Sequence, residues 1–443
     1  MNINKLFNKT YRDLYVPLLI EQVFLTLIGN FNVFLFSLFN DQMVAAIGIS
    51  DQLLNIFTML TNIVVLGASI LIIQNADFKR MDYVKSIFRE SLILNIILAM
   101  LIVIAVFIFN KNLLSLMQTP AELIGQTSIY IRIVSISIIF LAVTSLMLAS
   151  LRAFDFVKSA VRISVLNTIL VIVANSMIVI FKLGGIKNIA IATLIARFLA
   201  MLITFLTLKS HIPELFYSHK RKTIHLKKEI LSLGIPSAME QISYNFSQTI
   251  ITAIIASLGS LAVSSKIYTQ TITSFIFSIG VAAAVSGNLI IGNFYRNREY
   301  KKIKNFGILN ANTMSLIAGL VNLILALFGG YLVRIFTFDP KIIELVAKIL
   351  FFQILLDPMR VANEILVNSL NVLKDVKYPV IIGIATTYLF VLPLCYLLVK
   401  KMGMGLVAIW IIFIIDESLR RVLLTRRFKS LKWLNICRSE DEY

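Results

Sequence analysis

The sequence predicts an all-α polytopic membrane protein, with about twelve transmembrane helices in two pseudo-symmetric six-helix lobes. Its composition, 58% hydrophobic and 15% charged residues with a mean hydropathy of +0.87, is too apolar for a soluble globular protein. Apolar runs of about 20 residues, the length that crosses the ~30 Å of bilayer hydrocarbon, can be drawn about twelve times. The third observation is that the chain repeats itself.

The repeat is clearest at two prolines. Pro17 is followed by Glu21-Gln22, and Pro236 is followed by Glu240-Gln241, so the same pattern returns near the middle of the chain. Further pairs keep the spacing of these prolines to within one position: Asp51-Gln52 with Thr269-Gln270, Ile73-Gln74-Asn75 with Ile291-Gly292-Asn293, and Ser150-Leu151 plus Asp155 with Ser369-Leu370 plus Asp375. Duplicated bundles of this kind place substrate sites between their repeats.

The apolar runs fall into two groups of six on either side of a basic stretch. The predicted spans are 15–39, 44–74, 90–109, 126–150, 162–182 and 187–208, then 231–258, 262–293, 307–330, 343–370, 378–399 and 403–426. We therefore expect a first lobe at 1–208, a basic cytoplasmic linker at 209–229, a second lobe at 230–427 and a cytoplasmic tail at 428–443. The first run is too long for a signal-peptide core, so we expect it to be retained as a helix.

The orientation follows from Lys and Arg in the loops. If the N-terminus is cytoplasmic, the inner loops and ends hold 30 of these residues and the outer loops hold 7. The positive-inside rule then predicts a multi-pass plasma-membrane protein with both termini in the cytoplasm. This placement also explains the net charge of +19 by topology and anionic lipid rather than by nucleic-acid binding.

No pattern for a cofactor, metal or catalytic centre is present in the sequence. Cys395 and Cys437 are the only cysteines, and the three histidines all lie in the basic stretch. Phosphate-binding glycine loops, zinc-binding histidine pairs and nucleophile elbows are missing. We expect no enzyme and no cofactor, and we expect the energy to come from an ion gradient.

In the first half, Glu21 and Asp51 are the acids inside apolar runs. An ionised side chain at the bilayer centre costs about 2.5–3.5 kcal/mol on insertion scales, so each is a candidate functional residue. Glu21 recurs as Glu240, however, and an acid kept in both halves could equally hold a packing contact common to them. Asp51 shares its helix with several Asn and Thr residues, which favours a water-filled cavity over interhelical hydrogen bonds.

The second half is more polar. Glu240 and Tyr244 lie in the first span of this half and Lys266 lies in the next. The span 343–370 carries Asp357, Arg360 and Glu364 at i, i+3 and i+7, which places them on one helix face. That face is predicted to line the cavity, with a closed salt-bridge triad as the alternative. In the last span, Asp416 and Glu417 precede Arg420 and Arg421 by four residues, as snorkelling i, i+4 pairs do.

Four segments in this order resemble the MATE (multidrug and toxic compound extrusion) family over roughly residues 10 to 435. They are Val16-Pro-Leu-Leu-Ile-Glu-Gln22, Val44-Ala-Ala-Ile-Gly48, Ser150-Leu-Arg-Ala-Phe-Asp155 and Arg427-Phe-Lys-Ser-Leu-Lys-Trp433. The resemblance implies alternating access by two lobes around a central cavity. It also implies that proton or sodium entry drives the exit of bulky, often cationic organic molecules.

The chain departs from this family at its first-lobe cation site. Many members carry aspartates where Asn32 and Asn175 stand here, whereas Thr193 matches the family's threonine. An amide can offer its carbonyl oxygen to sodium but takes up no proton at physiological pH. The resemblance therefore implies a divergent member whose first lobe has lost proton coupling.

The favoured function is export of a small, cationic organic compound, and the alternative is a flippase for lipid-linked precursors from the same superfamily. A flippase would need a basic cavity for pyrophosphate, whereas acids outnumber bases within the predicted spans. An integral-membrane enzyme would need a catalytic constellation that the sequence lacks. The expected partners are the organic substrate, a proton or sodium ion and the lipid bilayer, but no nucleic acid, and we expect a monomer.

Overall fold

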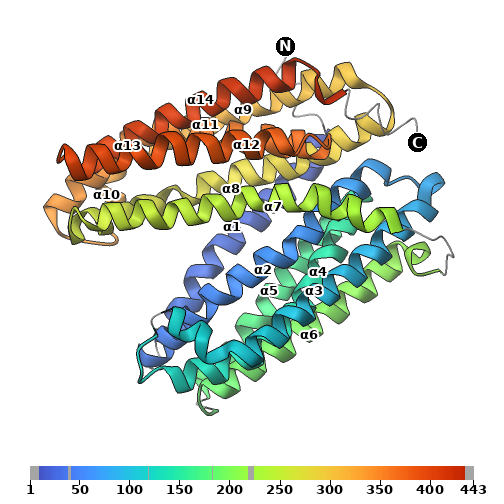
Figure 1. Ribbon diagram of the computed structural model, residues 1–443, viewed down its shortest axis with the longest axis horizontal. Helices are drawn as coiled ribbons and strands as arrows, with labels where there is room; N and C mark the ends of the chain where they lie inside the picture. The colour runs from blue at the N-terminus through green and yellow to red at the C-terminus, as the bar shows by residue number, and fades with distance from the viewer. Residues whose placement is uncertain (1–8, 38–40, 118, 182, 218–223, 435–443) are drawn as a thin grey trace. The chain divides into compact units, whose positions relative to one another are not determined.

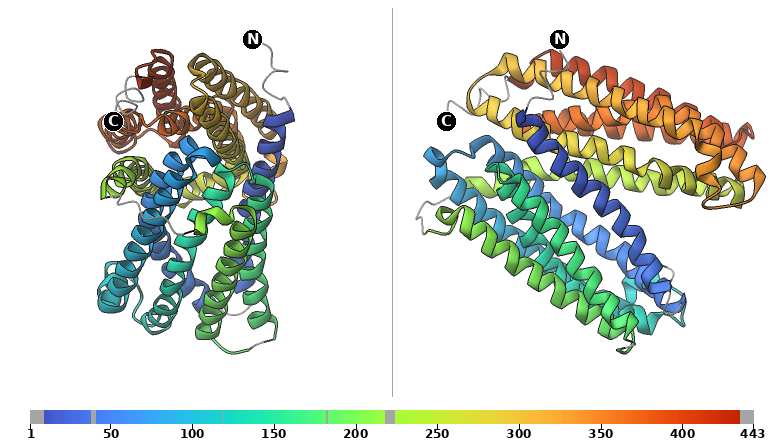
Figure 2. Two further views of the ribbon diagram at one scale, coloured as in Figure 1. Left: turned by 90° about the vertical axis from the view of Figure 1, so that its right-hand side faces the viewer. Right: turned by 180° about the vertical axis from the view of Figure 1, so that it is seen from behind.

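The structure, a computed structural model, describes residues 9–37, 41–117, 119–181, 183–217 and 224–434 (Figures 1 and 2). Within these residues the chain is helical and has no strand. Its long helices are α1 (Lys9–Ser37), α2 (Asp41–Asn75), α3 (Met81–Leu116), α4 (Ile124–Ala153), α5 (Val157–Ile180), α6 (Ile186–His211), α7 (Ile224–Ala256), α8 (Ser260–Arg296), α9 (Tyr300–Leu327), α11 (Pro340–Val372) and α14 (Leu406–Lys429).

One more span lies between α11 and α14, is called the twelfth span here, and consists of consecutive short helices. It comprises α12 (Lys377–Thr386), a π-helical turn at Thr387–Val391, α13 (Leu392–Tyr396) and a second π-helical turn at Leu397–Lys401. Short helices complete the described chain at Phe78–Arg80, Pro213–Phe216 and α10 (Gly329–Val333). Every predicted span thus corresponds to a long helix, and the predicted fold class is confirmed.

Eight of the helices in the described residues are long and apolar enough to cross a membrane by length and composition. The long helices outside this group are α1, α7, α11 and α14, which carry Glu21, Glu240, Asp357 and Asp416 respectively. The charges of the second half are therefore concentrated in helices that are less apolar than their neighbours.

The contacts divide the chain into two compact units. The first unit is Phe24–Ala238, and the second unit is Met1–Val23 together with Met239–Tyr443. Both borders between units fall inside a helix, one in α1 and one in α7. The lobe and linker boundaries drawn from the sequence differ from these borders and remain a prediction.

In the first unit, α4 packs against α2, α3 and α6, and α5 packs against α6. Apolar side chains such as Val134, Ile138 and Ala142 of α4 form its core with residues of α2, α3 and α6. The start of α7 joins this unit through close backbone contact with α2. A Cβ on Gly67 would meet the carbonyl oxygen of Ile230, and a Cβ on Gly234 would meet that of Ile63. Glycine at both positions permits this helix crossing.

In the second unit, α11 packs against α8, α9 and α14. The start of α1 belongs here, because the Tyr11 hydroxyl donates to Oδ1 of Asn310 at 2.8 Å and Tyr11 is fully buried. Nδ2 of Asn310 donates in turn to the Ala283 carbonyl of α8 at 3.1 Å. At the other end of the chain, Phe428 and Trp433 are fully buried.

The repeat predicted from the sequence appears in the helix ends. Helix α4 ends at Ala153 and α11 ends at Val372, and these ends have the same spacing along the chain as Pro17 and Pro236. Asp155 and Lys374 then both adopt left-handed backbone conformations, with φ of 66° and 62°.

Matching hydrogen bonds close the two ends. The Phe156 N–H donates to the Leu151 carbonyl at 2.9 Å, and the Asp375 N–H donates to the Leu370 carbonyl at 3.0 Å. Both are Schellman-type helix ends. Asp155 therefore corresponds to Lys374 rather than to Asp375, with which the sequence comparison paired it.

Candidate functional site

The candidate site lies in the second unit and begins on the predicted face of α11. Nη1 of Arg360 lies 3.6 Å from Oδ1 of Asp357, one helical turn away. The other oxygen of Asp357, Oδ2, accepts a hydrogen bond from Nδ2 of Asn322 on α9 at 3.1 Å. Asp357 is buried, so this buried acid has both an ion partner and an amide donor.

Arg360 also reaches across to α14. Its Nε lies 3.6 Å from Oε1 of Glu417, and the other Glu417 oxygen accepts from Nδ2 of Asn363 at 2.8 Å. The guanidinium lies 5.7 Å from the centre of the Phe413 ring. Both ion-pair distances exceed the usual hydrogen-bond range, so Arg360 is shared between two carboxylates without being locked to either.

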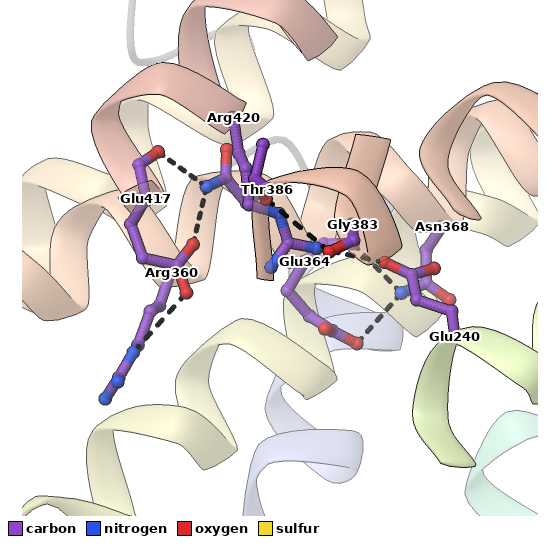
Figure 3. A network of polar contacts seen from close by, with 9 residues as sticks. Glu240, Arg360, Glu364, Asn368, Gly383, Thr386, Glu417 and Arg420 are labelled. Atoms are coloured by element: carbon purple, nitrogen blue, oxygen red, sulfur yellow. Dashed lines mark hydrogen bonds and ion pairs between the residues drawn. The ribbon is translucent and has the colours of Figure 1, made fainter. Parts of the chain in front are cut away.

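Glu364, the third residue of the predicted face, has a different environment. Its Oε1 accepts a hydrogen bond from Nδ2 of Asn368, four residues later, at 2.9 Å. The second acid beside Arg360 is thus Glu417 of α14 and not Glu364 of the same helix (Figure 3). The salt-bridge triad, which was the alternative interpretation of this face, is replaced by a pairing between two helices. Of the three residues predicted to line the cavity, only Arg360 does so.

A second ion pair joins α14 to α7. Nη2 of Arg420 lies 3.2 Å from Oε1 of Glu240, and both side chains are largely buried (Figure 3). A Cβ on Gly383 of α12 would lie 3.1 Å from that Nη2, so glycine at this position leaves room for the guanidinium. Arg421 points elsewhere and donates to Oδ1 of Asn312 on α9. The sequence interpretation of these residues as pairs within α14 did not anticipate their partners on α7 and α9.

A small cavity with a volume of about 20 Å³ adjoins the two arginines. The residues lining it come from α7, α11, the twelfth span and α14: Tyr244, Ser247, Gln248, Ile251, Arg360, Thr387, Val391, Phe413, Asp416, Glu417 and Arg420. Thr387 and Val391 begin and end a π-helical turn, a local widening of a helix that is frequent at functional sites.

Several polar atoms of the cavity walls are buried without a hydrogen-bond partner. They are Nε of Arg360, Nε of Arg420 and Oδ1 of Asp416. A buried donor or acceptor without a partner costs about 1–3 kcal/mol, more if it is charged. All three residues line the cavity, so their polar groups are candidates for contact with a molecule that enters it.

Lys266 lies in α8 of the same unit and is 5% exposed. Its Nζ donates to the Thr252 hydroxyl of α7 at 2.5 Å. Glu21 is also buried, at 1% exposure, in the part of α1 that belongs to this unit. Neither residue lines the cavity, whereas Tyr244 does.

The remaining predicted residues belong to the first unit or to its border. Thr193 donates to Oδ1 of Asn175 at 3.0 Å, and both side chains are buried. Asp51 is exposed. Asn32 belongs to α1, but its side chain lies outside the described residues.

Sequence reasoning missed Asn322 and Asn363, which support the acids of the site, and gave Glu417 and Arg420 no role in it. One signal was available, because Asp416 and Glu417 lie in the middle of the predicted span 403–426. Membrane-embedded charges are functional candidates unless their partners are known.

Comparison with known proteins identifies relatives along most of the chain. The family model described as MatE matches residues 17–177 and 236–397, so its two matches begin at Pro17 and Pro236, the two prolines of the sequence repeat. A Bacillus subtilis protein described as "Uncharacterized transporter YisQ" is 30% identical over 94% of this chain and 93% of its own length. A Thermotoga maritima protein described as "Probable multidrug resistance protein NorM" is 23% identical over 95% of this chain and 92% of its own.

Solved structures show the same fold. One described as "Crystal structure of MATE in the straight conformation" has a TM-score of 0.84 and 20% identity, covering 97% of this chain and 98% of that one. Another, described as "Outward-facing conformation of a multidrug resistance MATE family transporter of the MOP superfamily", has a TM-score of 0.83 and 19% identity, covering 96% of each chain.

Proposed function

Because this chain belongs to the MATE family, we propose that it is a secondary transporter that exports small organic cations. Export would proceed by alternating access, driven by a proton or sodium gradient. The proposed location is the plasma membrane of a bacterium, with both termini in the cytoplasm, and the proposed functional form is a monomer. An enzymatic activity is not proposed, because no catalytic constellation was found in the sequence.

The observation that carries the proposal is the cavity beside Arg360 and Arg420 with its unpartnered polar atoms. Asp416 is 6% exposed, yet its Oδ1 accepts no hydrogen bond. A buried carboxylate oxygen without a donor favours a ligand that brings a donor or a positive charge. The Phe413 and Tyr244 rings at the same cavity offer apolar and cation–π surface to an organic cation.

The charge of the surrounding network supports a cation as well. Acids outnumber bases in it: Glu240, Asp357, Glu364, Asp416 and Glu417 against Lys266, Arg360 and Arg420. A flippase for lipid-linked pyrophosphates, the alternative, would favour the opposite excess. Carboxylates can also take up a proton or sodium, so the same network is a candidate for coupling.

Transport by purified protein in liposomes tests the proposal. A fluorescent cationic dye serves as cargo, and a pH gradient or a sodium gradient is imposed separately. We expect export under at least one gradient and its loss in the Glu417→Gln variant. Glu344→Gln, which removes an exposed acid of the same helix as Asp357, is the matched control and should transport normally.

Two outcomes would contradict the proposal. In one, folded wild-type protein moves no dye under either gradient. In the other, the liposomes translocate a lipid-linked pyrophosphate while the dye stays in place, which would identify a flippase.

A further inference from the structure

The first unit contains a polar cluster that the proposed cavity does not use. The cluster consists of Asp51 on α2, Tyr130 and Ser137 on α4, Asn175 on α5, and Thr193 and Arg197 on α6. Two hydrogen bonds join α4, α5 and α6, from Thr193 to Asn175 and from Arg197 to Ser137, and Thr193 and Arg197 lie one turn apart on α6. Tyr130 lies two turns before Ser137 on the same face of α4. Hydrogen bonds thus join three helices of one unit, and Asp51 on α2 interacts with Arg197 electrostatically.

The oxygen atoms of this cluster are those of a small-cation site. Asn175, Thr193 and Tyr130 are 2–3% exposed and present an amide oxygen, a hydroxyl and a phenol. Neutral oxygens of this kind coordinate hard cations such as sodium. Their lone pairs are partly engaged here, since the Thr193 hydroxyl donates to Oδ1 of Asn175 at 3.0 Å.

A positive charge is already built into the cluster. Nη1 of Arg197 donates to the Ser137 hydroxyl at 2.6 Å, which fixes the guanidinium against α4. Asp51, whose side chain is exposed, interacts with it electrostatically. A guanidinium stays protonated in proteins and is attached to its helix, so it can neither dissociate nor lose its charge.

We propose that Arg197 is a tethered internal cation that excludes inorganic cations from the first unit. Its charge repels a free ion from the oxygens of Tyr130, Thr193 and Asn175. The first unit is then independent of the coupling ion, and ion binding is left to the carboxylates of the second unit. This inference rests on the proposed gradient-driven export, but its test measures ion binding and requires no transport.

The test compares purified variants by their melting temperature in sodium chloride and in choline chloride at equal ionic strength. Wild type sets the reference, which includes any sodium effect of the second unit. Arg197→Met removes the charge and leaves Asp51 and the oxygens available. We expect sodium to raise the melting temperature of this variant by about 2–4 °C more than that of wild type.

Two further variants establish where the sodium binds. Adding Asp51→Asn to Arg197→Met removes the acid of the cluster and should return the sodium response to the wild-type value. Arg132→Met, which removes an exposed arginine of α4, is the control and should behave as wild type. If Arg197→Met does not fold, Arg197→Gln keeps a donor for Ser137 while it removes the charge.

The proposal fails if the folded Arg197 variants respond to sodium no more than wild type. It also fails if their gain survives Asp51→Asn, because sodium would then bind elsewhere. If wild type exports no dye but the variants respond to sodium as expected, the proposed function fails and this inference stands.

Discussion

The polar cluster of the first unit holds one acid and one arginine, whereas the network of the second unit holds five acids and three basic side chains. Both belong to halves with the same helix ends, as the matching bonds at Phe156 and Asp375 show. The backbone repeat has therefore been kept while its charges have diverged. A duplicated fold can thus keep an excess of buried acids in one copy while the polar cluster of the other copy holds equal numbers of acids and bases.

The largest effect is expected from breaking the ion pair between α7 and α14. Arg420→Met leaves Glu240 buried without its cation, and loss of one member of a buried pair costs about 3–5 kcal/mol. We expect a large fall in melting temperature or loss of folded protein. Adding Glu240→Gln should restore much of the stability, and no recovery in the double variant would show that the pair is not what stabilises this contact.

The next prediction sets one unit directly against the other. Glu417→Gln removes a carboxylate beside Arg360 and should lower gradient-driven dye export at least tenfold without loss of folded protein. Asp51→Asn removes the acid of the first unit and should change export by no more than about twofold. Initial rates in liposomes check both, and equal losses in the two variants would refute the division of roles between the units.

A smaller effect is expected at Glu364. Its carboxylate accepts from Asn368 rather than from an arginine, and a glutamine can still accept that bond through its amide oxygen. We expect Glu364→Gln to fold normally and to reduce cation export about threefold, because one negative charge near the cavity is lost. Full export by Glu364→Gln would remove this acid from the proposed site.

The smallest predicted effect tests what the two halves share. A β-branched residue fits the left-handed conformation poorly, so Asp155→Val and Lys374→Val should each destabilise by about 1–2 kcal/mol. Asp155→Gly and Lys374→Gly are the controls and should be tolerated. Melting temperatures measure the losses, and a cost in only one half would show that the two helix ends are not equivalent.

The sequence predicted the helices and the repeat but not the ion pairs. Apolar runs of membrane length and a pattern that returns at a nearly constant spacing are properties of the chain read in order, so each span could be placed. Glu240 and Arg420 are separated by 180 residues, and only the packing of α7 against α14 brings them together.

The same reason explains what the sequence did not reveal at the site. Periodicity correctly placed Asp357 and Arg360 on one face of α11. It could not show that the ion partner of Arg360 across the helix interface is Glu417 of α14 and not Glu364 of its own helix. Asn322 and Asn363 carried no signal, because single amides in membrane helices are common and their role depends on a neighbour.

The borders of the compact units inside α1 and α7 bear on how such a chain could arise. The first turns of α1 pack with the second half through Tyr11 and Asn310, and the first turns of α7 pack with the first half through Gly234 and Gly67. The first helix of each half thus begins in the compact unit formed mainly by the other half. A half-length ancestor with this arrangement would have been complete only as a homodimer that exchanged these segments, and fusion of the two genes would have made the exchange permanent.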